Sequence, residues 1–153
     1  MPWFVLLFLL FAPPQEETEQ LMRAFEALPR DSVEEKIALL DRIDILNQEK
    51  GATFLIRIRE DDPAESVRAH AFFLWAEANM DQEVIRYLDA LKTKALLDFI
   101  PVVPRLTAMD GERYLISLFE REDLSRNRKV LIHALAAVKT ESAFQFLKAG
   151  WNE

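Results

Sequence analysis

The stretch DPAESVRAHAFFLWAEA, residues 62–78, decides the fold of this chain. An aspartate followed by a proline is a common start for a helix, and no further proline or glycine interrupts the stretch. Its apolar side chains are not confined to one stripe, because they include Val67, Ala71 and the run from Phe72 to Trp75. A helix that is apolar nearly all round has to be covered on several sides. The stretch therefore predicts a helix inside a stack of helices.

Apolar pairs recur along the chain with a period of about thirty residues, and this period indicates what the neighbouring helices are. From Phe25 and Leu28, steps of 30, 30, 30 and 29 residues each lead to another pair of large apolar residues. These pairs are Leu55/Ile58, Ile85/Leu88, Leu115/Leu118 and Phe144/Leu147. A second column with the same spacing contains residues that suit helix starts or turns: Gly51, Asp81, Gly111 and Thr140. A period of this length is typical of a repeat protein built from helix pairs.

Each repeat is predicted to contain a first helix, a tight turn and a second helix that carries the apolar pair. First helices are expected at residues 32–48, 63–78, 94–108 and 126–138, and second helices at 17–28, 52–60, 82–91, 112–121 and 141–149. Ser32 with Glu35 matches a capping box, and Asp62 precedes Pro63 at an expected first helical position. The predicted fold is all-α, a right-handed α-α superhelix of about four helix pairs after an N-terminal half-repeat.

The stretch 62–78 followed by NMDQEVIRYLDAL resembles a HEAT repeat of the short, thirty-residue bacterial type, and so does RKVLIHALAAVKTESAFQFLKAG. The resemblance rests on the Asp-Pro start, on Val67-Arg68, on the alanines and on the apolar pair of the second helix, and it covers about residues 16–150. Short HEAT repeats are usually protein-interaction scaffolds, so the resemblance implies a scaffold. The segment DFIPVVPRL departs from the pattern, because Pro101 and Pro104 lie inside an expected first helix. A kink or break is expected near Ile100.

Composition excludes several classes of function. The chain has 153 residues and a net charge of −7, which disfavours binding to nucleic acid and electrostatic docking on an anionic membrane. It contains no cysteine, so disulfides, thiol catalysis and thiolate metal sites are excluded. Its three glycines are far apart, so a glycine-rich phosphate loop is excluded as well.

The N-terminal segment MPWFVLLFLLFAPPQ, residues 1–15, differs from the repeat domain expected at residues 16–153. Ten unbroken apolar residues are about half of what a bilayer core requires, and this length suits the apolar region of a signal peptide. Export to the periplasm or cell envelope is therefore expected. The alternatives are an apolar segment packed on the fold, which would leave the chain in the cytoplasm, and a permanent membrane anchor.

The sequence contains little that indicates catalysis. His70 and His133 are the only histidines, each is followed by alanine, and no carboxylate pattern beside them suits a metal site. The iron-binding His-Glu dipeptides of some HEAT-like enzymes are therefore missing. We expect no catalytic residue, no metal site and no cofactor, and hence no enzymatic activity.

The expected binding surface lies on the second helices, which line the concave face of such a stack. Helical steps of about 100° per residue place six side chains on the side facing away from the core. These are Thr53, Ile56, Glu83, Arg86, Arg113 and Ile116. The ladder of Ile56, Arg86 and Ile116 would suit an extended or helical peptide whose carboxylate pairs with the arginine. The alternative is that both isoleucines are buried between repeats and the arginine is merely solvated.

Two hypotheses on function follow from this pattern. The first is an exported, non-enzymatic scaffold whose partner is another protein or peptide, with a homodimer as a further option and with membrane contact only through an uncleaved N-terminal segment. The second comes from the resemblance to phycobilin lyases, which share the short repeat. It is a protein that handles a tetrapyrrole-like small molecule, or a lyase-like enzyme. A deep pocket lined by Trp75, His70 or Trp151 would favour the second hypothesis.

Overall fold

The computed structural model describes residues 14–46, 49–107 and 109–150, and every element in these ranges is a helix. The chain divides into two compact units, Met1–Trp75 and Ala76–Glu153. The prediction of an all-α fold is therefore confirmed for the described residues. The expected export segment, residues 1–15, lies almost entirely outside them. None of the described helices combines the length and the apolar character that crossing a membrane requires.

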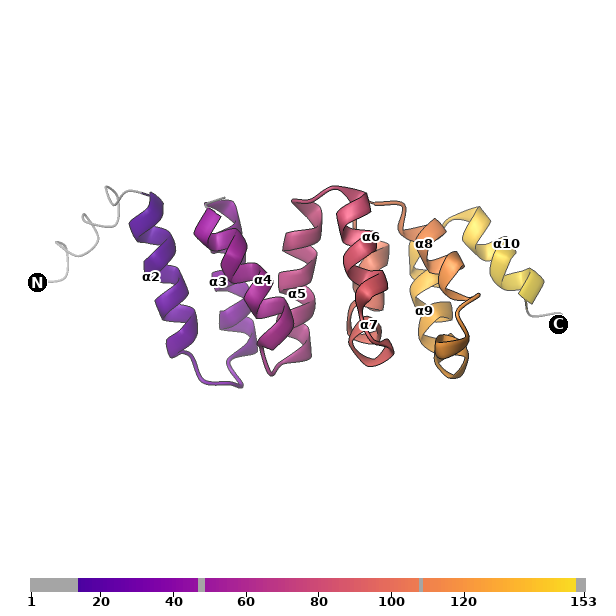
Figure 1. Ribbon diagram of the computed structural model, residues 1–153, viewed down its shortest axis with the longest axis horizontal. Coiled ribbons are helices and arrows are strands. Elements are labelled where there is room, and N and C mark those ends of the chain that lie inside the picture. The colour runs from indigo at the N-terminus through magenta and orange to yellow at the C-terminus, as the bar shows by residue number, and fades with distance from the viewer. Residues whose placement is uncertain (1–13, 47–48, 108, 151–153) are drawn as a thin grey trace, which may run out of the picture. The chain divides into compact units, whose positions relative to one another are not determined.

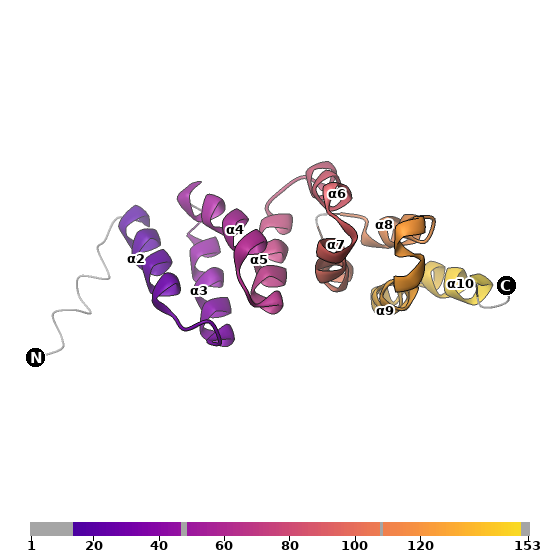
Figure 2. The same ribbon diagram turned by 60° about the horizontal axis from the view of Figure 1, so that its bottom comes forward.

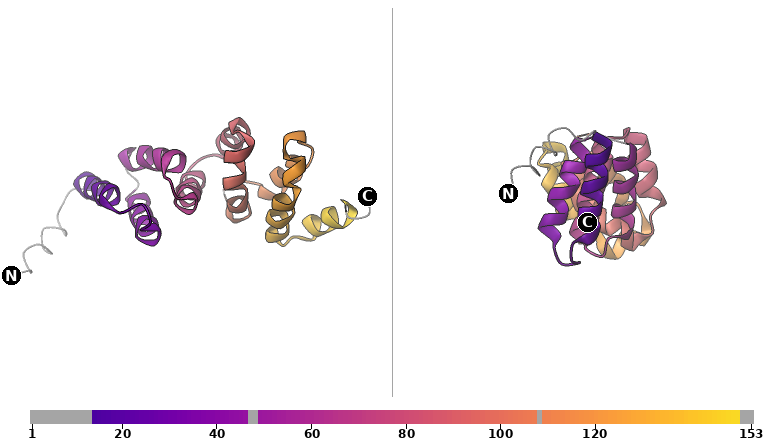
Figure 3. Two further views of the ribbon diagram at one scale, coloured as in Figure 1. Left: turned by 90° about the horizontal axis from the view of Figure 1, so that it is seen from below. Right: turned by 90° about the vertical axis from the view of Figure 1, so that its left-hand side faces the viewer.

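The first unit contains α2 (Pro14–Ala27), α3 (Val33–Ile45), α4 (Glu49–Asp61) and most of α5 (Glu65–Glu77). These helices lie side by side (Figure 1). Helices α2, α3 and α4 pack against one another. Viewed along the helices, α2 and α4 form one layer, whereas α3 and α5 form the other (Figure 3). The alternation matches the predicted order of second and first helices.

Among the described residues, the second unit contains the end of α5 and seven further elements (Figure 2). They are α6 (Asp81–Ala90), α7 (Thr93–Phe99), the 3₁₀ helix η1 (Ile100–Arg105), α8 (Gly111–Leu118), the 3₁₀ helix η2 (Glu122–Asn127), α9 (Arg128–Val138) and α10 (Glu141–Gly150). Helix α9 packs on η1, α8 and α10. The predicted break near Ile100 is confirmed, because the α-helix ends at Phe99 and the proline-containing segment continues as η1.

Of the ten residues in the periodic apolar pairs, six are buried and three are half-buried. Phe25, Leu55 and Leu115 occupy one column, and each exposes 4% of its surface or less. The opening stretch behaves as expected too, since Val67, Ala71 and Phe72 are fully buried. Ile85 in the same column is half-buried, and Phe144 departs furthest from the pattern, because 59% of it is exposed on α10.

Two expectations about helix starts are wrong. The Ser32 side chain accepts no capping hydrogen bond at the start of α3, where its backbone has a ψ of 61° instead of the extended value of a typical cap. Helix α5 begins at Glu65, so Pro63 does not occupy the first helical position. The carboxylate of Asp62 instead accepts the backbone N–H of Ala64 at 2.9 Å and pairs with Lys36.

The glycine column has a packing role that differs from the expected one. Gly51 lies inside α4, where an added Cβ would be 3.0 Å from Cγ2 of Ile43. Gly111 is the first residue of α8, where an added Cβ would be 2.8 Å from the carbonyl oxygen of Val103. At Gly111 the cap comes from the neighbouring Asp110, which accepts the N–H of Arg113, whereas Thr140 caps α10 as predicted by accepting the N–H of Ala143. Both glycines therefore allow close approach of helices.

Candidate functional site

Thr53 and Ile56, the two binding residues predicted in the first unit, are exposed on α4. Ile56 exposes 38% of its surface, so the alternative in which it is buried between repeats does not hold. Thr53 donates its hydroxyl hydrogen to the carbonyl oxygen of Glu49 at 3.1 Å. Thr53 lines a groove beside α2, and Ile56 is not among the residues that line it.

The four binding residues predicted in the second unit lie on α6 and α8. Glu83 and Arg86 are exposed on α6, Arg113 is exposed on α8, and Ile116 is half-buried on α8. Arg113 lines a groove between the two helices, whereas Glu83, Arg86 and Ile116 do not. The residues of the expected ladder, Ile56, Arg86 and Ile116, therefore line neither of these two grooves.

The larger groove, about 580 Å³, lies between α2 and α4 and is called the α2–α4 groove below. Its lining residues are Met22 and Glu26 from α2, and Glu49, Lys50, Thr53, Phe54 and Arg57 from α4. The apolar part is held by the core, because Phe54 is buried and its ring packs edge-on against Phe25 with 5.3 Å between centroids. The groove thus has an apolar floor on a rigid support.

Ion pairs between α2 and α4 form the charged rim of this groove. Lys50 donates to the carboxylate of Glu19, and Arg57 donates to that of Glu26. The hydrogen bond and the charge of Lys50 lower the pKa of Glu19. The Arg57 guanidinium carbon also lies 4.9 Å from the centroid of the Phe54 ring. Both signs of charge therefore flank an apolar strip, an arrangement that suits a peptide with apolar and polar side chains.

A second groove, about 300 Å³, lies between α6 and α8 and is called the α6–α8 groove below. It is lined by Asp81, Ile85 and Asp89 from α6, by the capping residue Asp110, and by Arg113, Tyr114 and Ser117 from α8. The Tyr114 hydroxyl donates to Asp89 at 3.1 Å. Burial, helped by the nearby Asp89 carboxylate, raises the pKa of Tyr114. Three aspartates and one arginine give this groove a net negative charge.

The polar chemistry of the first unit is structural. Lys36 and Asp62 form a buried ion pair with 2.9 Å between Nζ and Oδ2, and Nζ of Lys36 also lies 5.3 Å from the centroid of the Phe25 ring. His70 Nε2 lies 2.6 Å from Oδ1 of Asp41, which links α5 to α3. Nearby, burial and the Asp41 carboxylate raise the pKa of Asp44. Neither cluster places a nucleophile beside a base.

His70 and Trp75 are the described residues that a ligand pocket was expected to use, and both contact other side chains. Within the described ranges, no three His, Asp or Glu side chains lie together in a way that could hold a metal ion. Trp75 packs against Arg59, whose guanidinium carbon lies 3.9 Å from the ring centroid. Neither His70 nor Trp75 lines the two grooves, and Trp151 lies outside the described residues.

Met22, Phe54 and Tyr114 are functional candidates that sequence reasoning did not single out. Phe54 and Tyr114 directly precede the apolar anchors Leu55 and Leu115, so they occupy the same place in two repeats. This shared register is the signal that could have identified them.

Comparison with known proteins gives no match: no family model, no curated protein and no solved structure is significantly similar to this chain.

Proposed function

We propose that the chain is a non-enzymatic protein-interaction scaffold of the HEAT-repeat type, built as a right-handed superhelix and exported from the cytoplasm. The observation that supports it best is the α2–α4 groove, which is open, apolar at its floor and charged at its rim. Two second helices form its walls, as the binding surface of a helical-repeat scaffold requires.

Hydrogen bonds at the repeat period support the repeat interpretation. In the first unit, side-chain contacts join Glu19 to Lys50 and Asp41 to His70, whose positions differ by 31 and 29. In the second unit, Thr93 donates to Asp123, and the backbone N–H of Thr107 donates to Glu77, both across 30 residues. Equivalent positions of successive repeats therefore touch, which is the contact pattern of a stack of similar units.

The partner that fits the α2–α4 groove is a peptide segment with apolar side chains flanked by charged ones. The half-buried Met22, supported by the buried Phe54 ring, would contact the apolar side chains, and the rim pairs would exchange partners with the charged ones. Exposed ion pairs are individually weak, so opening them costs little free energy. Affinity would then depend mainly on the apolar floor.

Site-specific photo-crosslinking in the cells that make the protein tests this proposal. A benzoylphenylalanine at Thr53 places the reactive group in the groove, and one at Ile45, which is exposed on α3, serves as the control. A discrete crosslinked protein seen only with the Thr53 probe supports the proposal. Identical crosslinking patterns from both positions would contradict it.

A pair of variants distinguishes the groove from the ladder expected from the sequence. Met22→Asp charges the groove floor, whereas Ile56→Asp charges the exposed side of α4 outside the groove. Both are first checked for folding by circular dichroism. We expect Met22→Asp to lose the captured partner and Ile56→Asp to keep it. The reverse result would place the binding surface on the ladder.

A further inference from the structure

Helix α10 exposes an apolar residue at a repeat position that is buried in three earlier helices. Phe144 exposes 59% of its surface, although Phe25, Leu55 and Leu115 in the same repeat column are buried. Other sides of α10 are well packed: Ala143 is buried, and the Phe146 ring contacts Phe119 with 5.2 Å between centroids. Helix α10 therefore leaves its column aromatic residue exposed.

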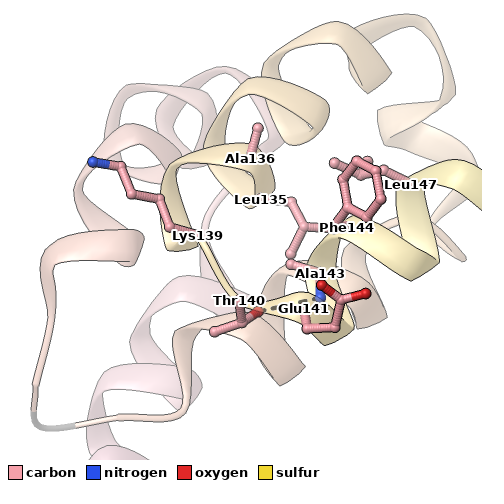
Figure 4. Close-up of a pocket in the computed structure, with 8 residues that line it drawn as sticks. All are labelled: Leu135, Ala136, Lys139, Thr140, Glu141, Ala143, Phe144 and Leu147. Carbon is pink, nitrogen blue, oxygen red and sulfur yellow. Dashed lines mark hydrogen bonds between the residues drawn. The ribbon is translucent and has the colours of Figure 1, made fainter.

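Phe144 lies beside a groove of about 320 Å³ between α9 and α10 (Figure 4). Its lining residues are Leu135, Ala136, Lys139, Thr140, Glu141, Ala143, Phe144 and Leu147. The close-up shows Phe144 and Leu147 adjacent on α10, with Leu135 opposite them on α9. A protruding aromatic ring beside a partly apolar hollow can pack against the same surface of a second copy, so the contact is self-complementary.

The charges on α10 specify the orientation in which two copies fit. Glu141 and Lys148 are both exposed and lie seven residues apart, which is close to two helical turns. With Phe144 they follow the spacing i, i+3, i+7 and therefore share one side of the helix. Phe144 lies near the midpoint between the two charges. In an antiparallel pair of α10 helices, each glutamate therefore faces the lysine of the other copy, while the two phenylalanines meet at the centre.

We propose that two copies of this chain associate through an antiparallel pair of α10 helices centred on Phe144. This surface is separate from the α2–α4 groove, and the inference does not depend on the proposed scaffold function. A ten-residue helix is about 15 Å long, so the pair buries less surface than a standard stable interface. The expected dissociation constant is on the order of 100 µM, which makes the dimer concentration-dependent.

Sedimentation velocity of the full chain between about 5 and 500 µM measures this association. The native chain shifts toward the dimer as its concentration rises. Phe144→Asp places a carboxylate at the centre of the contact and removes the shift, with binding at least about 30-fold weaker. Ser142→Lys and Ala149→Glu add charge to exposed positions of α10 away from this side and leave the association within about threefold of the native chain.

A charge-exchange experiment tests the antiparallel register. E141K and K148E each create like-charge contacts in their own homodimers, so each associates about tenfold more weakly than the native chain. An equimolar mixture of the two restores association, because the heterodimer again pairs lysine with glutamate. Thermal unfolding confirms that every variant is folded.

Three results would overturn the proposal. They are a native chain that stays monomeric at 500 µM, an equal loss of association in the Ser142→Lys and Phe144→Asp variants, and a mixture of E141K with K148E that associates no better than either alone. The last result would contradict the antiparallel orientation even if Phe144→Asp abolished association.

Discussion

The two units accommodate the same thirty-residue period with different irregularities. In the part of the chain that the structure describes, all buried polar or charged residues belong to the first unit: Thr18, Lys36, Arg59 and Asp62. The second unit has an apolar core, but one of its first helices is broken at Ile100 and continues as a 3₁₀ helix. Repeat stacking therefore tolerates a buried ion pair in one place and a distorted helix in another, provided that the apolar column is kept.

The grooves of the two units also differ, in the charge of the side chains that line them. The α2–α4 groove has an apolar floor with paired charges at its rim, whereas the α6–α8 groove contains three aspartates and one arginine. In each unit, a groove lies between two helices that the sequence predicts to be successive second helices. The side chains at positions outside the apolar pattern differ between the two grooves. Under the proposed function, the two grooves would therefore suit different segments of a partner.

Asp62→Asn gives the largest expected loss of stability, because it leaves the buried Lys36 ammonium without its counter-charge. Removal of one partner of a buried ion pair costs about 3–5 kcal/mol. Chemical denaturation measures the loss, and Asp61→Asn at the exposed neighbouring position is the control. Equal stability of the two variants would show that the pair does not support the first unit.

Alanine substitutions at Gly111 and Gly51 give the next largest expected losses of stability. Because each unit contains one of these glycines, the two variants compare the units directly. Gly111→Ala drives a Cβ to 2.8 Å from a backbone carbonyl oxygen and is expected to cost about 1–3 kcal/mol. Gly51→Ala meets a side-chain methyl group at 3.0 Å, and the better helix propensity of alanine offsets the crowding, so its net effect is within about 1 kcal/mol of zero. Thermal melts of the two variants measure both effects. A larger loss of stability in Gly51→Ala than in Gly111→Ala would contradict the expected order.

Tyr114→Phe is expected to cost about 0.5–1.5 kcal/mol, because it removes the hydrogen bond to Asp89. It also changes the response to alkali. The pKa of Tyr114 is raised in the folded chain, so the folded state retains a proton that the unfolded state loses above its ordinary value of about 10. The native chain therefore loses stability as the pH rises above about 10, and part of this loss disappears in the variant. Melting temperatures between pH 9 and 11.5 measure it, and identical slopes would contradict the assignment.

Asp123 gives the smallest effect, at low pH. Hydrogen bonds from Arg121 and Thr93 lower its pKa to about 2, from an ordinary value of 3.8. Its contribution to stability is complete above pH 3.8 and is lost as the pH falls toward 2. Arg121→Gln removes the guanidinium and should move the carboxyl titration of Asp123 upward in an NMR pH series. An unchanged titration would show that the pair does not form in solution.

Local signals were enough to predict the helices. Apolar spacing defined the second helices to within a few residues, and the prolines at 101 and 104 located the break at Ile100. The pairing of Lys36 with Asp62 could not be predicted, because it joins residues 26 apart and depends on how α3 is rotated against the turn before α5.

Helix rotation also explains why only part of the candidate site was found. Counting about 100° per residue placed Thr53 and Ile56 on the exposed side of α4, and both are exposed. The groove opens on the side of α4 that faces α2, where Thr53 lies and Ile56 does not. A single sequence fixes the exposed side of a helix more readily than the direction of its neighbour.

Backbone amide hydrogen exchange, measured with and without the partner that the Thr53 probe captures, tests the central claim most directly. The claim is that the second helices form the binding surface of a scaffold. It predicts that bound partner slows exchange in α2 and α4, with any further protection in α6 and α8, while α3, α5 and α9 are unchanged. Protection concentrated in α3, α5 and α9 would contradict it, because the partner would then lie on the first helices.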